Sequence, residues 1–143
     1  MNHPSRLLEI SKYNKDGYKP IVDYDSWRVA ILNYHKELLP KNIDKMQKHN
    51  KTDEVFVLLK GKCTLFFSDG DEQIGKIYSK DMKPFKAYNI KKGVWHTHTL
   101  SKDGKVLIIE NRDTSLKNSP EKDLKEKEIK QIINLAKSSQ INK

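Results

Sequence analysis

The stretch QKHNKTDEVFVLLKG, residues 47–61, decides the interpretation of the fold. It sets His49 and Glu54 on either side of a polar, turn-like segment, residues 50–53, and an apolar run follows Glu54 until Gly61. A short run of β-branched and large apolar residues between turn signals predicts a strand. We therefore expect the histidine and the carboxylate to lie together at the mouth of one strand pair.

Similar short runs occur along most of the chain and are separated by clusters of Gly, Asp and Asn. Strands are predicted at residues 27–34, 43–48, 54–59, 63–67, 73–78, 85–90, 94–100 and 105–110, with shorter ones at 7–10 and 21–22. Short strands at near-regular spacing are typical of a β-sandwich or β-barrel. The segments are too short for helices, so the pattern argues against a parallel α/β fold.

Three of the five histidines lie in informative places. His96 and His98 are two residues apart on one predicted strand and share a face, so an inward-facing pair could meet His49 and Glu54. Two imidazoles and a carboxylate form a ligand set for Fe, Zn, Mn or Ni. The alternative is a metal-free pocket in which the histidines hydrogen-bond a buried Glu54. The remaining two, His3 and His35, are interpreted as a solvated tail residue and a structural residue.

Two segments together resemble the motifs of small single-domain proteins of the cupin superfamily. The spacing Gln47-x-His49-x4-Glu54-x6-Gly61 is similar to the first motif, in which two histidines two apart precede a glutamate and a glycine follows. Residues 93–96, Gly-Val-Trp-His, are similar to the second. The resemblance covers roughly residues 43–111. It implies an all-β fold, a cupin-type jelly-roll β-barrel, which is often a homodimer and in many members holds a metal.

Carried over by position, the resemblance makes His49, Glu54 and His96 the metal ligands. The family's first histidine is replaced by Gln47, whose carbonyl oxygen is a weaker ligand than imidazole. His98, on the same face as His96, is the alternative fourth ligand.

Two other positions depart from the second motif, because Lys91 stands where proline is usual and Leu100 where a polar residue is usual. The residues predicted to line a substrate pocket are Tyr34, Phe56 and Trp95, although aromatic residues in such places are more often core. Cys63 is interpreted as a small core residue.

The C-terminal region changes character. A helix is predicted over residues 120–137, because Ser119 can cap it and Pro120 suits its first position. Its apolar stripe comprises Leu124, Ile129, Ile132, Ile133 and Ala136. We therefore expect a barrel domain over residues 1–116, including the N-terminal strands, and a charged amphipathic helix with a tail over 117–143.

The net charge of +9 comes from 28 Lys and Arg against 19 Asp and Glu. The excess is almost entirely lysine and is spread along the chain, which favours a solvated surface over a nucleic-acid site. One cysteine allows no intrachain disulfide and fits a reducing compartment. No stretch approaches the roughly 20 apolar residues that span a bilayer. We expect a cytoplasmic protein without a membrane or nucleic-acid partner.

Two functions follow from these observations. The first is a cupin that acts on a small molecule with a divalent ion, Fe, Mn, Ni or Zn, held inside the barrel. The alternative is a non-enzymatic small-ligand-binding or sensor protein without a metal. The reaction type stays open because one fold hosts many chemistries.

Overall fold

The computed structural model describes residues 4–139, so His3 lies outside the described residues. Within that range it contains ten strands, one α-helix and three short 3-10 helices. The strands are β1 Tyr18–Tyr24, β2 Trp27–Asn33, β3 Lys45–Gln47, β4 Glu54–Lys60, β5 Cys63–Ser68, β6 Ile77–Asp81, β7 Ala87–Ile90, β8 Trp95–Leu100, β9 Lys105–Asn111 and β10 Glu121–Asp123. The helices are α1 Glu126–Lys137, η1 Pro4–Arg6, η2 Lys36–Leu38 and η3 Pro40–Asn42.

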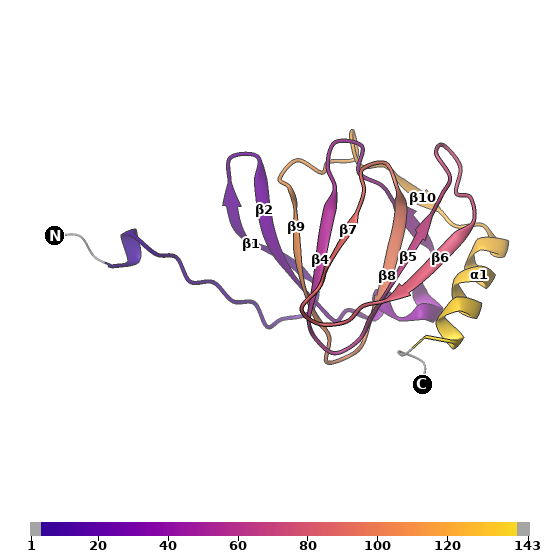
Figure 1. Cartoon of the computed structure of the whole chain (residues 1–143), viewed down its shortest axis with the longest axis horizontal. Helices are drawn as coiled ribbons and strands as arrows, with labels where there is room; N and C mark the ends of the chain where they lie inside the picture. The colour runs from indigo at the N-terminus through magenta and orange to yellow at the C-terminus, as the bar shows by residue number, and fades with distance from the viewer. Residues whose placement is uncertain (1–3, 140–143) are drawn as a thin grey trace.

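The strands form two antiparallel sheets of five strands each (Figure 1). Sheet I has the order β1-β2-β9-β4-β7 and sheet II the order β10-β3-β8-β5-β6. From β6 onward the chain alternates between the sheets at every strand, and this connectivity fits a jelly roll. The predicted all-β fold with a C-terminal helix is confirmed.

A first core fills the space between the sheets. Alternation along β9 sends Val106 and Ile108 inward, and β4 contributes Phe56 and Leu58 to the same layer. Cys63 is fully buried in this core, as expected for a small apolar side chain. Polar residues at the inward-facing positions of β4, β8 and β9 therefore lie between the two sheets.

A second core lies on the opposite face of sheet II, beneath α1 (Figure 1). Ile132 and Ala136 of the helix pack there with Met46, Phe66 and Trp95. The helix thus covers the outside of sheet II and takes no part in the space between the sheets. Within the described residues, no helix is long and apolar enough to cross a bilayer.

The helix prediction is correct in place but wrong at its start. Residues 121–123 form β10, which pairs antiparallel with β3, and α1 begins only at Glu126. The Lys125 backbone N–H donates to the Glu128 carboxylate at 2.8 Å and closes the first turn. Ser119 and Pro120 therefore lead into an edge strand instead of capping a helix. Pairing with β3 gives the backbone groups of residues 121–123 their hydrogen-bond partners.

Two strand predictions are also corrected. Residues 7–10 form no strand; Leu7 and Ile10 are 80% and 86% exposed on a segment that runs away from the sheets (Figure 1). The strand expected at 73–78 is displaced to Ile77–Asp81, because residues 69–76 form a loop held by Ser68 and Asp69. A strand needs a neighbour for its backbone groups, and residues 7–10 have none in the described chain.

Candidate metal centre

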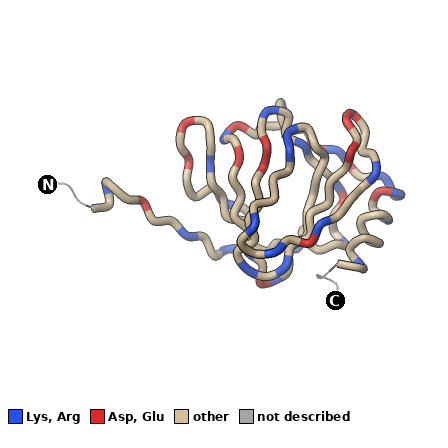
Figure 2. Tube along the Cα trace, in the orientation of Figure 1, with Lys and Arg blue, Asp and Glu red and all other residues tan. Residues whose placement is uncertain are grey.

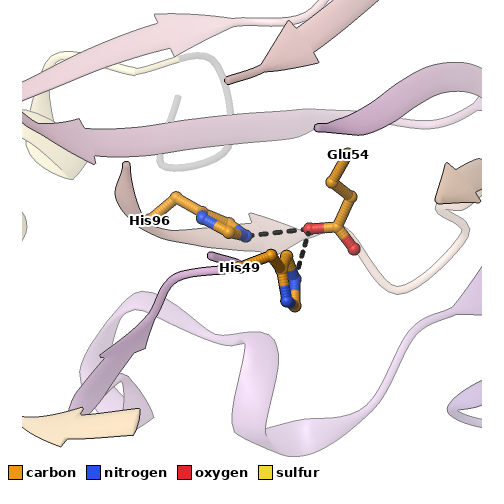
Figure 3. Close-up of side chains that lie close together, drawn as sticks. All are labelled: His49, Glu54 and His96. Atoms are coloured by element: carbon orange, nitrogen blue, oxygen red, sulfur yellow. Dashed lines mark hydrogen bonds and ion pairs between the residues drawn. The ribbon is translucent and has the colours of Figure 1, made fainter. Parts of the chain in front are cut away.

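Three polar side chains meet between the sheets at the end of β4 (Figure 3). His49 lies just after β3, Glu54 begins β4 and His96 is the second residue of β8. Their exposed fractions are 5%, 5% and 2%. Antiparallel pairing sets His96 directly opposite Gln47, so two elements far apart in sequence bring the histidines together.

The distances define a tight cluster. The His96 Nε2 atom lies 2.8 Å from Glu54 Oε1, and His49 Nε2 lies 3.4 Å from the same oxygen (Figure 3). One donor atom from each of the three residues lies within 4.8 Å of the others. The structure thus brings together the three residues that the sequence predicts as ligands.

The outer nitrogen of each ring is held by a hydrogen bond. His96 Nδ1 lies 2.9 Å from the Val94 carbonyl oxygen, which can only accept, so Nδ1 carries a proton. His49 Nδ1 lies 2.7 Å from the Ser119 hydroxyl, and that hydroxyl donates to the Asn118 Oδ1 atom. Ser119 therefore accepts from His49. In the neutral form, both rings turn their Nε2 lone pairs toward Glu54.

Two lone pairs and a carboxylate that face one another need a positive group between them. Burial raises the pKa of Glu54, but hydrogen bonds from His49 and His96 outweigh burial and hold that pKa well below its ordinary value. Burial lowers the pKa of His49, and Glu54 more than offsets this, so the pKa is raised. This positive charge can come from protons on the two rings or from a bound cation. Metal-binding histidines commonly donate their other N–H to a carbonyl or similar acceptor, so these residues fit a divalent ion.

A second carboxylate, Glu110 of β9, lies directly opposite Glu54 in the strand register and, like His98, is outside the group of three. Its Oε1 atom accepts from Tyr18 at 3.0 Å and from the Arg28 guanidinium at 2.7 Å. Its Oε2 atom is buried, makes no hydrogen bond to any described residue and lies 3.6 Å from His49 Nε2. Burial, and then the nearby Glu54 carboxyl, raise the pKa of Glu110 to about 7.

Gln47 and His98 take different positions around this cluster. The Gln47 amide nitrogen lies 3.5 Å from His49 Nε2, so its side chain borders the site. His98 is outside the group of three and packs its ring against Phe56, with centroids 5.5 Å apart. Both His98 nitrogens are buried without a hydrogen-bond partner among the described residues, and burial lowers its pKa to about 4.

A cavity of about 360 Å³ opens beside the cluster, between β3, β8 and the η2–η3 segment. Gln47, His96 and His98 form its inner wall. The other lining residues are Glu37, Leu38, Asn42, Ile43, Asp44, Lys45, Met46, Thr97 and Glu121. The volume is within the usual range of small-molecule sites.

The three aromatic residues predicted for a substrate pocket are not among those that line this cavity. Phe56 belongs to the first core, where its ring contacts His96 and His98. Trp95 faces the other side of β8, in the core under α1, and its indole donates to the Asp71 carbonyl oxygen. Tyr34 is half-buried at the end of β2. Trp95 neighbours His96 in sequence, and strand alternation places the two on opposite faces.

Sequence reasoning missed Glu110, Arg28, Tyr18 and Ser119. For Glu110 a signal was present, because it continues the inward alternation of Val106 and Ile108 at the end of a predicted strand. A carboxylate in such a register is a buried charge that needs a partner. Ser119 carried no signal of its role, since only the pairing of β10 with β3 brings it to His49.

Comparison with solved structures shows the same arrangement of strands. A cupin-2 domain protein from Shewanella frigidimarina aligns with a TM-score of 0.52 at 21% identity, over 70% of this chain and 85% of that one. This chain has the fold of a small cupin. A Bacillus halodurans protein aligns over 71% of this chain and 74% of that one, with a TM-score of 0.54 and 13% identity.

A further structural neighbour is a variant of Streptomyces PAC13 with uridine. It has a TM-score of 0.52 and 8% identity, and the alignment covers 80% of this chain and 84% of that one. No protein-family model matches the sequence, and comparison with curated proteins gives no match. The likeness therefore concerns the fold, and the function of this protein must be argued from its own residues.

Proposed function

We propose that this cupin holds a divalent metal ion with His49, Glu54 and His96 and acts on a small molecule in the adjoining cavity. The observation that carries the proposal is the convergence of two imidazole Nε2 atoms on one buried carboxylate. A bound ion of this kind polarises an oxygen of a substrate or lowers the pKa of a bound water.

The residues around the ion have separate tasks in this proposal. The Val94 carbonyl and the Ser119 hydroxyl keep the two rings turned toward the centre. Gln47 and His98 face the cavity and would contact the small molecule. Since an imidazole is both a donor and an acceptor when neutral, the unpartnered His98 suits a ligand with hydroxyl, amide or carbonyl groups.

Binding of metal is tested on protein prepared without a histidine tag and stripped of metal by a chelator. We expect about one Mn(II), Fe(II), Ni(II) or Zn(II) per chain by titration calorimetry and a raised melting temperature, since an ion bound only to the folded state stabilises it. The variant Glu54→Gln should lose both effects. Glu126→Gln is the matched control, because that carboxylate is 85% exposed on α1, outside sheet II, and lines no part of the cavity. Absence of binding to the unmodified protein would contradict the proposal.

We also propose that the protein is a cytoplasmic homodimer. The outer face of sheet I supports the dimer, because half-buried Val29, Val55, Val57 and Leu107 surround Ile109, which is 38% exposed. The single buried Cys63 is compatible with a reducing compartment.

A further inference from the structure

We infer that Glu110 is a fourth ligand of the metal centre, so that the ion is held by two imidazoles and two carboxylates. The inference rests on the proposed function and concerns a residue outside both sequence motifs. Glu110 occupies the register position opposite Glu54 on the neighbouring strand. It thereby supplies a strong ligand to a site in which Gln47 stands in place of a histidine.

The two oxygens of Glu110 are differently engaged. Oε1 accepts from the Tyr18 hydroxyl and from Arg28 Nη2 and Nε, at 3.0, 2.7 and 3.3 Å. Arg28 is itself fixed by the Arg112 carbonyl and the Thr114 hydroxyl. This clamp on one oxygen orients the carboxylate and leaves Oε2 turned toward His49, 3.6 Å from its Nε2 atom. Ordered carboxylate ligands are commonly held in this way by a second layer of hydrogen bonds.

A purely structural ion pair with Arg28 does not account for Oε2. That atom is buried without a hydrogen bond, and the Glu110 side chain is only 3% exposed. It also faces a second buried carboxylate, and the positive groups beside the two are the Arg28 guanidinium and, when protonated, the His49 and His96 rings. Buried charges of one sign are costly unless they are paired or coordinate a metal. A divalent cation bound by Glu54 and Glu110 would give Oε2 a ligand bond in place of the missing hydrogen bond and would offset the negative charge.

A second carboxylate also changes which ion the centre prefers. Imidazoles suit zinc and nickel, whereas carboxylate oxygens suit harder ions such as Mn(II). Removal of Glu110 should therefore weaken Mn(II) binding more than Zn(II) binding. A residue that acted only on the fold would weaken both to the same degree.

The test compares Glu110→Gln with the unmodified protein, Glu54→Gln and the exposed control Glu126→Gln, with Mn(II) and Zn(II) as probes. We expect a loss of Mn(II) affinity in Glu110→Gln of roughly 10- to 100-fold or more, the range known for residues that merely support metal ligands. The metal-free variant should melt at or above the temperature of the unmodified protein. Its amide oxygen still accepts from Arg28 and Tyr18, and the repulsion with Glu54 is gone.

A metal ligand and a purely structural residue at position 110 thus predict opposite results for the Mn(II) affinity and the melting temperature. Unchanged Mn(II) affinity in a folded Glu110→Gln protein, with binding lost in Glu54→Gln, would overturn this inference and leave the proposed function intact. A lower melting temperature with unchanged affinity would assign Glu110 to the fold alone. If the unmodified protein binds neither ion, the proposed function itself fails. Should Glu110→Gln not fold, Glu110→Asp keeps the charge but withdraws the carboxylate by one methylene, and it must still weaken Mn(II) binding.

Discussion

The Ser119 hydroxyl holds His49 in a single tautomer. It accepts a hydrogen bond from His49 Nδ1 and donates one to Asn118 Oδ1, so the lone pair of His49 Nε2 stays on the side of Glu54. The Val94 carbonyl accepts from His96 Nδ1 and in the same way fixes the tautomer of His96. Both rings are thereby oriented before any ion arrives, which reduces the ordering that binding requires.

Replacing Ser119 with alanine should therefore weaken metal binding by roughly 10- to 100-fold, the usual effect of losing such a supporting group. The His49 ring would lose its acceptor and could turn its N–H toward the centre. Titration calorimetry with Zn(II) measures the change. Ser138→Ala removes an exposed serine hydroxyl that bonds only within the end of α1, and it should leave the affinity unchanged. Equal affinities for the two variants would show that Ser119 does not orient His49.

At the scale of single residues, the sequence predicts the three central ligands but not their surroundings. His49, Glu54 and His96 stand at the spacings of the two motifs. The structure brings them together because each lies at or next to the end of a strand. Glu110 enters through the register of β4 against β9. His98 shares a face with His96, yet its ring turns to Phe56 and lies outside the group of three. Side-chain direction inside a core is decided by packing, which spacing alone does not specify.

At the scale of elements, β10 connects the C-terminal region to the site. The Lys48 and Asn50 backbone N–H groups donate to the Pro120 and Asn118 carbonyls, and this ladder sets Ser119 against His49. A Ser-Pro pair followed by acidic residues is a reasonable signal for a helix start. Here the signal was overridden because the edge of β3 offered tertiary pairing, while the helix retained its apolar stripe from Ile129 onward.

The docking of α1 on sheet II gives a prediction for stability. Ile132 is 1% exposed in the core with Phe66 and Trp95, so Ile132→Ala should lower the free energy of unfolding by about 2–4 kcal/mol. Ile133→Ala is the matched control, since Ile133 is only half-buried on the same helix and should cost less. Urea denaturation followed by circular dichroism measures both. Similar losses for the two variants would mean that Ile132 is not the anchor of the helix.

At the scale of the whole molecule, the two sheets have different outer faces. Sheet II is covered by α1, whereas the described chain places no helix over the outer face of sheet I (Figure 1). Lys and Arg are spread along the trace and mixed with Asp and Glu, without one continuous basic segment (Figure 2). The predicted absence of a nucleic-acid partner stays a prediction, and the apolar face of sheet I is the better candidate for contact with another chain.

A second copy of this chain is the partner we expect on that face, since a C2 interface buries the same patch on both subunits. Ile109 stands at its centre on β9, between Val29 of β2 and Val55 of β4. Ile109→Lys should convert a dimer into a monomer, as measured by light scattering after size-exclusion chromatography, without changing metal stoichiometry. Leu116→Lys adds the same charge at a residue that is 73% exposed outside the sheet and should leave the dimer intact. A dimer that survives Ile109→Lys must use another surface, and a monomeric unmodified protein would remove the proposal of a dimer altogether.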